Sequence, residues 1–291
     1  PPAELVDFLV ETSVLDAFDA GLCMDVTGRA EAPDLLDRLL AANLFVVPLD
    51  DQARWYRYHH LFGAFLRARL ASLGTARLQA AHDRACRVLE DRRDVEGALT
   101  HAIAMGDVER AGRILRAALD RSMSMAEGAD VAARALRLWL HEFGAAFVET
   151  DPAGVVEFLI GLITLDGADD APSWLDRVRR AHPHADGELT ALIEGAWNEH
   201  HQLRGQPREA IRRLHLALDA VGGRPPSRGL LSLLHAATAG AHVQAGELDA
   251  AGAVVEQALA HPTGGRVADD VRVPGIAAFV AAATGEPSKA D

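Results

Sequence analysis

The sequence predicts a mainly α-helical protein that begins with a small hairpin-containing domain and continues as stacked helix pairs. Two short apolar and aromatic runs between residues 44 and 59 are typical of paired strands. From Thr75 onward, apolar residues recur with helical spacing instead. A Gly-x4-Ala-x6-Ala spacing also occurs three times, which is typical of repeated helix pairs.

Short helices are expected over residues 3–43. The run "AELVDFLVETSVL" brings Phe8 and Leu9 near one helical stripe. The run "EAPDLLDRLLAAN" opens with Pro33, which suits a first helical turn, and stops at Asn43.

A β-hairpin is expected next. "LFVVPL" (44–49) is apolar and partly β-branched, and Pro48 cannot donate to a ladder, so this is an edge strand. "DDQA" supplies a turn, and "RWYRYH" (54–59) then alternates between two faces. We expect Tyr56 and Tyr58 to share the face that packs inside the wing.

A helix is expected directly after the hairpin, because apolar residues recur at helical spacing. This apolar stripe comprises Leu61, Phe62, Phe65, Leu66 and Leu70. Short helices, a two-stranded wing and a closing helix are the order of a winged-helix domain, which we assign to residues 1–72.

Helix pairs are expected over the rest of the chain. The repeated spacing occurs at Gly106/Ala111/Ala118, Gly205/Ala210/Ala217 and Gly246/Ala251/Ala258. Each glycine would lie in a turn, and the alanines of the second helix would let its partner approach closely. Because one such pair cannot bury its own apolar face, neighbours must stack. We expect residues 73–125 to form a helical linker with the first helix pairs, and residues 126–291 an α-superhelix of degenerate tetratricopeptide-like helix pairs.

The composition is that of a folded protein, with 49% hydrophobic and 24% charged residues. No apolar stretch approaches the roughly 20 residues of a membrane helix, and the N-terminus lacks the features of a signal peptide. Cys23 and Cys86 are too few for a disulfide framework, so we interpret them as small buried residues. A cytoplasmic protein with no membrane partner is expected.

The net charge of −13 makes nucleic acid an unlikely partner, because a duplex-binding surface needs clustered Lys and Arg. Residues 51–72 are a local exception, with four arginines against one aspartate and a net charge of +3. DNA contact by the winged helix is therefore an alternative at this stage.

Lysine usage limits the chemistry further. Lys289 is the only lysine of the chain. The phosphate-binding loop of P-loop ATPases needs a Gly-rich turn followed by Lys and Ser or Thr. No such loop exists here, so we expect no enzyme activity of that kind and no cofactor bound by this chain itself.

None of the histidine pairs has the spacing of a metal or catalytic site. His59 and His60 are adjacent, and adjacent residues of a helix do not face each other. "HPH" (182–184) falls in a Pro-containing loop, where its histidines would be solvated, and "EHH" (199–201) falls late in a helix, where a cation complements the helix dipole. None has the i, i+4 pair and third ligand of a zinc helix, and no carboxylate or cysteine pairing indicates catalysis.

The first part of the chain resembles a known family. The residues from "FLVETSVLDAF" through "WYRYHHLFGAFLRARL" resemble the winged-helix domain of MalT-type regulators, and "AHDRACRVLEDRRDVEGALTHAIAMGDVERAGRIL" resembles the helices that follow it. The resemblance covers roughly the first 120 residues, and the rest is similar in style only.

MalT-type regulators are signal-transduction ATPases of the LuxR family. The resemblance implies a nucleotide-binding domain before the winged helix, a superhelical sensor after it, and a C-terminal helix-turn-helix. This chain would then be a middle fragment, with ATP or ADP held by the absent neighbouring domain, and the complete relative would be a slow ATPase switch. In that family the winged helix acts as an intramolecular hinge, which argues against direct nucleic-acid contact by the fragment.

In the wider ATPase class, the winged helix supplies a histidine that touches the β-phosphate of bound ADP. That histidine lies in a His-x-Leu context at a helix start, and "HHLF" places His59 there, followed by Leu61. The resemblance therefore implies nucleotide sensing by His59 in the full-length protein. A helix N-terminus also offers free N–H groups to an anion. The alternative is a residue that caps the helix or packs the wing, and no role is transferred to His60.

The expected function is regulation of transcription. The fragment would couple the nucleotide state of the nucleotide-binding domain to the binding of an effector at the helical repeats. The effector would be a small molecule or a protein, and the sequence does not indicate which residues contact it. ADP would hold a closed monomer, and effector with ATP would release it to form a homo-oligomer. A stand-alone helical-repeat scaffold that binds a protein partner is the alternative.

Overall fold

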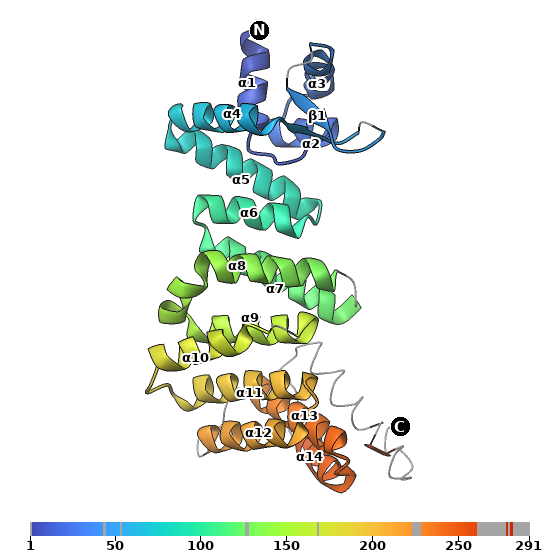
Figure 1. Cartoon of the computed structure of the whole chain (residues 1–291), viewed down its shortest axis with the longest axis vertical. Coiled ribbons are helices and arrows are strands. Elements are labelled where there is room, and N and C mark those ends of the chain that lie inside the picture. The colour runs from blue at the N-terminus through green and yellow to red at the C-terminus, as the bar shows by residue number, and fades with distance from the viewer. Residues whose placement is uncertain are drawn as a thin grey trace. The chain divides into compact units, whose positions relative to one another are not determined.

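The computed structural model describes residues 2–42, 45–52, 54–125, 128–167, 169–222 and 228–260, together with residues 278, 280 and 281. Fourteen labelled helices and one two-stranded antiparallel sheet lie within these residues (Figure 1), so the mainly α fold is confirmed. The chain divides into two compact units, residues 1–115 (unit 1) and 116–291 (unit 2). The predicted boundaries after residues 72 and 125 stay predictions.

Unit 1 begins with three short helices, continues with the hairpin and closes with longer helices. Its elements are α1 (Ala3–Thr12), α2 (Ala20–Thr27), α3 (Ala32–Ala41), β1 (Val46–Pro48), β2 (Tyr56–Tyr58), α4 (His60–Ser72), α5 (Thr75–Asp91), α6 (Val95–Met105) and the start of α7 (Val108–Met125). This is the predicted order of a winged-helix domain. Its core includes the fully buried Phe8, Phe18, Leu35, Leu39 and Leu70.

The hairpin pairs Val46 with Tyr58 and Pro48 with Tyr56 in antiparallel register. Both strands are shorter than predicted, and Leu44 lies outside the described residues. An isolated bridge joins Tyr56 to Phe18, whose backbone N–H and C=O both bond to it at 2.8 Å. The segment before α2 therefore extends the small sheet by one residue pair.

The expected apolar stripe of α4 is only partly buried. Leu66 and Leu70 lie in the core, whereas Leu61 and Phe65 are 68% and 63% exposed. The five predicted positions span more than one helical face, because residues 61 and 65 together are offset from residues 66 and 70 by about 140° of helical rotation. The helix thus presents an apolar edge away from the unit 1 core.

Unit 2 continues with helices that pack on their neighbours in sequence. They are α8 (Ala129–Thr150), α9 (Pro152–Asp166), α10 (Ala171–Ala181), α11 (Gly187–Leu203), α12 (Pro207–Val221), α13 (Arg228–Ala245) and α14 (Leu248–Ala260). In Figure 1, α8, α9, α11 and α12 follow one another as successive layers, and each contacts the next.

The repeated glycine–alanine spacing marks three helix pairs: α6–α7, α11–α12 and α13–α14. Gly106, Gly205 and Gly246 each lie between the paired helices with φ of 66°, 66° and 77°. A residue with a Cβ is strained in this left-handed region, so glycine is required there. The alanines that follow are at most 4% exposed, at Ala111, Ala118, Ala210, Ala217 and Ala251. The side chain of Ala258 lies outside the described residues.

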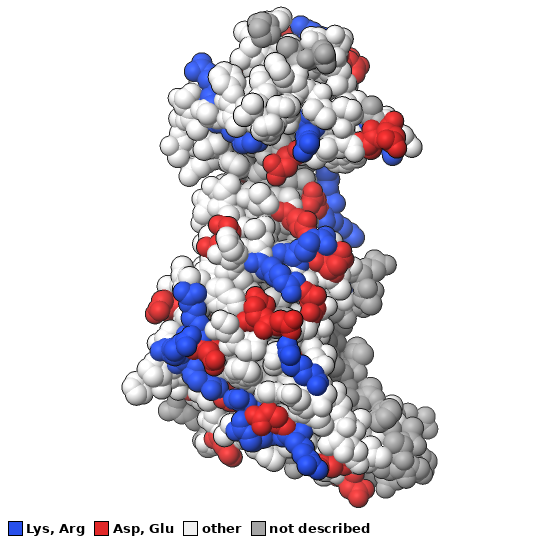
Figure 2. Space-filling view, in the orientation of Figure 1, with Lys and Arg blue, Asp and Glu red and all other residues white. Residues whose placement is uncertain are grey.

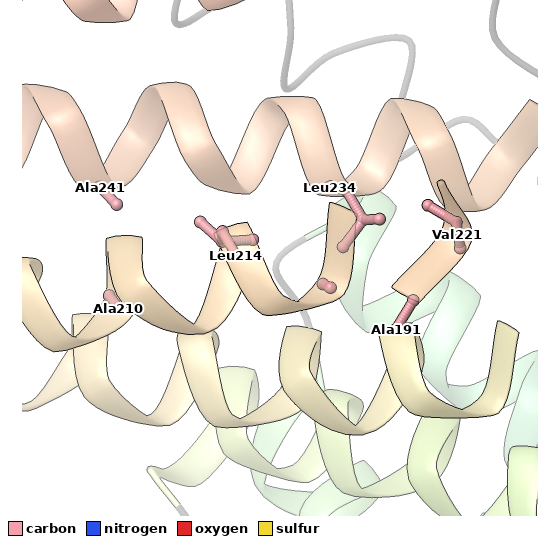
Figure 3. Packing of buried hydrophobic residues seen from close by; sticks show 7 residues of the cluster. Ala191, Ala210, Leu214, Val221, Leu234 and Ala241 are labelled. Carbon is pink, nitrogen blue, oxygen red and sulfur yellow. The ribbon is translucent and has the colours of Figure 1, made fainter. Parts of the chain in front are cut away.

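The alanines allow close helix packing in unit 2. Figure 3 shows Ala210 and Leu214 of α12 between Ala191 of α11 and the α13 residues Leu234 and Ala241. All five side chains are 1% exposed or less. The small alanine side chains among them let three helices share one apolar layer.

Candidate functional site

His59 occupies the N-cap position of α4. Its backbone has φ −52° and ψ 136°, which is extended, and helical geometry begins at His60. The side chain makes no capping hydrogen bond and is exposed. The position at a helix start is as predicted, while the helix-capping alternative lacks the bond that it requires.

The backbone of His59 is held on both sides. Its N–H donates to the carbonyl of Phe45 at 2.7 Å, and its C=O accepts from the N–H of Gly63 at 2.9 Å. The imidazole therefore projects from a fixed backbone beside the first turn of α4. The N–H groups of that turn have no partner within the helix and, with the helix dipole, favour an anion.

The rings of His59 and His60 lie against each other, with centroids 4.3 Å apart and planes tilted by 37°. The expectation that these neighbours face apart is wrong. It assumed that both residues are helical, but His59 is extended, so the offset of about 100° between successive helical residues does not apply.

The tyrosines of β2 pack as predicted. Tyr58 is 6% exposed and Tyr56 is half-buried, whereas Trp55 and Arg57 face outward. Burial raises the pKa of Tyr58 well above its usual range, so its hydroxyl stays protonated and can donate a hydrogen bond.

Large apolar side chains near His59 are exposed. Phe45 is 58% exposed, Leu61 68% and Phe65 63%, and the half-buried Phe62 ring lies 5.2 Å from Phe45 and 6.5 Å from Phe65. We call Phe45, Leu61, Phe62 and Phe65 the apolar edge of unit 1. Contiguous exposed apolar side chains of this kind mark interaction sites more often than scattered ones do.

The locally basic stretch of residues 51–72 has acidic residues nearby in the sequence. The carboxylate of Asp50 accepts the N–H groups of Arg54 and Trp55 at 3.0 and 3.1 Å, which lowers its pKa and keeps it charged beside them. The exposed side of α3 carries Asp34 and Asp37. Figure 2 shows basic and acidic side chains interleaved on the visible face of the described residues. The predicted absence of a nucleic-acid partner stays a prediction.

Two other histidines of unit 1 form a pair that the sequence did not indicate. The Nδ1 atoms of His82 on α5 and His101 on α6 lie 2.9 Å apart. Burial lowers the pKa of both, and that of His101 falls to about 4. The pair is therefore neutral at neutral pH, with one ring donating and the other accepting.

The cysteines are buried and free, as predicted. Burial raises the pKa of the Cys23 thiol to about 12 and that of Cys86 to about 11. Neither is a nucleophile at neutral pH. Within the described part of the chain, no group of three or more His, Cys, Asp or Glu side chains is arranged to hold a metal ion.

Two histidines of unit 2, His182 and His200, depart from expectation. His182 is half-buried, with Nε2 2.5 Å from the carbonyl of Val148, whereas His184 is exposed as predicted. His200 is 6% exposed, and burial lowers its pKa. The neutral ring is therefore favoured, and the predicted cation at the end of α11 is wrong for this residue.

Unit 2 also contains a partly buried charged cluster that sequence reasoning missed. Glu194 of α11 is 6% exposed and pairs with Arg179 of α10 and, at 3.0 Å, with Arg213 of α12. The Arg213 guanidinium lies 4.8 Å from the centroid of the Trp197 ring. No spacing rule reports such a cluster, because its members come from three helices.

The buried nitrogens Trp197 Nε1, His200 Nδ1 and His201 Nε2 of α11 have no hydrogen-bond partner within the described residues. Most buried polar atoms are paired, so three such nitrogens on one helix are unusual, although Trp139 Nε1 and Arg213 Nε of the described part of unit 2 are also without a hydrogen-bond partner. None of the described helices has the length and apolarity needed to cross a membrane.

Comparison with known proteins concerns the first third of the chain. Residues 1–101 match the family model of the MalT winged helix domain. A 95-residue segment is 35% identical to the HTH-type transcriptional regulator MalT of Vibrio cholerae serotype O1, covering 33% of this chain and 9% of that protein. A 109-residue segment is 32% identical to the protein of the same name from Klebsiella pneumoniae, covering 38% and 12%. The same comparison with solved structures found no significant match to the chain.

These matches agree with the fold of unit 1. Residues 1–101 have a winged-helix fold and are similar to the MalT winged helix domain, in agreement with the resemblance. The matched segments span about a tenth of the length of the relatives, so the matches describe this domain and not the activity of a whole protein.

Proposed function

We propose that this chain is the regulatory centre of a MalT-type transcriptional activator, in which His59 contacts the β-phosphate of ADP bound by an adjacent nucleotide-binding domain. The relation to transcriptional regulators supports a role in regulation. The observation that carries the nucleotide proposal is the exposed, uncapped imidazole of His59 at the N-terminus of α4.

The local chemistry suits a phosphate. An imidazole N–H and the free amides of the first turn of α4 are all donors, and the helix dipole adds partial positive charge. The backbone hydrogen bonds of His59 to Phe45 and Gly63 hold the backbone that carries the imidazole in place. A pre-positioned donor loses little freedom when it binds.

The partner of this surface would be the nucleotide-binding domain of the same protein. The apolar edge flanks the candidate phosphate contact, because Phe45 accepts the His59 N–H and Leu61 lies two residues further on. A domain that covers this edge would bury exposed apolar surface and exclude water from the phosphate.

The test is ADP affinity of the complete protein that carries this domain. His59→Ala is expected to weaken ADP binding about ten- to a hundredfold, the effect of losing one hydrogen bond to a charged group. His60→Ala is the matched control, since it removes the neighbouring ring, and should stay within about twofold of wild type. Equal affinities for the two variants would refute the proposal.

A second measurement uses this chain alone. The site is half of a composite one, so titration with ADP or ATP should give no calorimetric signal. Binding in the micromolar range would mean that the chain holds nucleotide by itself and that the adjacent domain is unnecessary.

For the effector, we place the sensing function in unit 2. Repeated helix pairs offer an extended surface whose neighbouring layers can shift, and the unsatisfied nitrogens of α11 are buried in the helix stack that carries this surface. ADP would favour a closed monomer, and effector with ATP would favour self-association, so each ligand must prefer a different state. Effector binding that leaves ADP affinity unchanged would refute this coupling.

A further inference from the structure

We propose that Thr12 and Tyr58 form the positioning pair for His59: a buried hydrogen bond from the Tyr58 hydroxyl to Thr12 anchors the end of β2 to α1 and so fixes the backbone from which the imidazole projects. The two oxygen atoms lie 2.7 Å apart. The importance of this pair for nucleotide sensing rests on the proposed function, whereas its effect on the His59 backbone does not.

The direction of the hydrogen bond follows from the geometry. The Thr12 hydroxyl donates to the carbonyl of Phe8 at 2.7 Å, so its one proton is used. The Tyr58 hydroxyl must therefore donate to Thr12 Oγ1. Thr12 is 0% exposed and Tyr58 6%, so water does not compete for either group.

Tyr58 contacts three separate parts of unit 1. Its ring lies 4.7 Å from that of Phe18 in the segment before α2, and 5.9 Å from that of Phe62 on α4. A Cβ on Gly63 would lie 3.4 Å from the Tyr58 Cβ, so α4 passes close to this residue. The hydroxyl adds α1 to these contacts.

His59 is the next residue, and its side chain has no capping bond of its own. Its position depends on the backbone bonds to Phe45 and Gly63, which in turn depend on where β2 ends and α4 begins. Tyr58 packs on both α4 and the segment before α2 and is anchored to α1, so it fixes that junction.

The first test measures amide hydrogen exchange in this chain after Thr12→Val, which keeps the shape of the side chain and removes the acceptor. The N–H groups of His59 and Gly63 are hydrogen-bonded and should be protected. We expect their exchange to become about three- to tenfold faster, the effect of losing one buried hydrogen bond. Tyr58→Phe, which keeps the ring contacts, should act in the same direction.

Two controls separate positioning from general destabilisation. Thr12→Ser retains a hydroxyl and should restore slow exchange. Thr238→Val removes a buried threonine that makes the same i−4 bond, to Leu234 at 2.7 Å, and should leave His59 unchanged. Unchanged exchange at His59 in Thr12→Val, or equal acceleration of all unit 1 amides without rescue by serine, would overturn the proposal.

The second test measures ADP release from the complete protein. Thr12→Val should accelerate release when His59 is present and have no further effect in a His59→Ala background, because it acts through that residue. Additive effects in the two backgrounds would overturn positioning. If His59→Ala itself leaves release unchanged while Thr12→Val loosens the His59 amide, positioning stands and the nucleotide-sensing proposal fails.

Discussion

Unit 1 and unit 2 differ in how far along the chain their side-chain hydrogen bonds reach. In unit 1, Arg84 donates to the carbonyl of Val26 at 3.1 Å across 58 residues, and Arg92 donates to Asp25 at 2.6 Å across 67. The Thr12–Tyr58 bond spans 46 residues.

In unit 2, the bonds that join helices connect near neighbours in sequence. Asn198 donates to the carbonyl of Ala210 across 12 residues, and Gln202 donates to that of Ala237 across 35. Each of these bonds joins one helix to the next or the next but one.

The difference separates a closed domain from a stack. Unit 1 links its first helix to its hairpin and its second helix to α5, so each link joins elements that are far apart in sequence. In unit 2 each layer is supported by its neighbours, so we expect a destabilising substitution to affect mainly the adjacent helices. A fixed scaffold such as unit 1 suits the proposed role of His59, which requires one position. A stack of helices such as unit 2 suits the proposed sensing surface, which would change shape.

The largest expected effect comes from removing a buried aromatic ring in each unit. Phe18→Ala and Trp139→Ala both delete side chains that are at most 1% exposed, at an expected cost of about 3–5 kcal/mol each. By hydrogen exchange, Phe18→Ala should loosen α1, β2 and α4 together, whereas Trp139→Ala should loosen α8 and α9 far more than α14. Uniform loosening of unit 2 would break the comparison.

A second effect is a pH dependence of unit 1. The folded-state pKa of His101 is about 4, below its ordinary value of 6.5, so protonation favours the unfolded state. The contribution of the His82–His101 pair is complete above pH 6.5 and is lost as pH falls towards 4, by up to about 3 kcal/mol.

The measurement is the urea midpoint of unit 1 unfolding between pH 7 and pH 4, in wild type and His101→Gln. Carboxylates titrate in both proteins, so the difference between their curves of urea midpoint against pH reports the contribution of the His82–His101 pair alone. Parallel curves would show that His101 contributes nothing to the pH dependence.

A smaller effect is expected from the buried amide of unit 2. Asn198 is 0% exposed, and Asn198→Ala leaves the carbonyl of Ala210 without that donor, at a cost of about 1–3 kcal/mol. Since the bond joins α11 to α12, exchange should rise in those two helices and remain at the wild-type rate in α8. Calorimetric unfolding gives the size, and equal loosening of α8 would contradict the nearest-neighbour picture.

The smallest effect is at the turns. Gly205→Ala places a Cβ at φ 66° and should cost about 1 kcal/mol, although no atom lies within 4 Å of that Cβ. Gly195→Ala is the matched control within helix α11, where the added Cβ meets only Leu234 at 3.7 Å, and should stabilise by about 0.5–1 kcal/mol. Thermal unfolding should show shifts of opposite sign, and shifts of the same sign would contradict the turn assignment.

The sequence predicted those features that depend on neighbouring residues. The hairpin around Tyr58 was indicated by alternating side chains, the helix that follows it by a change of period, and the turns at Gly205 and Gly246 by spacing. In each case, local backbone preference and side-chain periodicity agree with the tertiary structure.

What the sequence did not predict comes from contacts between distant segments. Neither the Thr12–Tyr58 bond nor the His82–His101 pair has a local signature, because each joins elements whose approach is set by packing. The exposure of Phe65 was missed for the same reason: helical spacing shows which residues share a face, but not how much of that face a neighbour covers.

The most direct test of the account is a structure of the complete protein with ADP bound. We expect a nitrogen of the His59 imidazole about 2.7–3.2 Å from a β-phosphate oxygen, with α4 pointing its N-terminus at the phosphate and the apolar edge covered by the nucleotide-binding domain. A structure in which ADP is bound and the His59 ring remains in solvent, or in which another residue of the winged helix meets the β-phosphate, would contradict it.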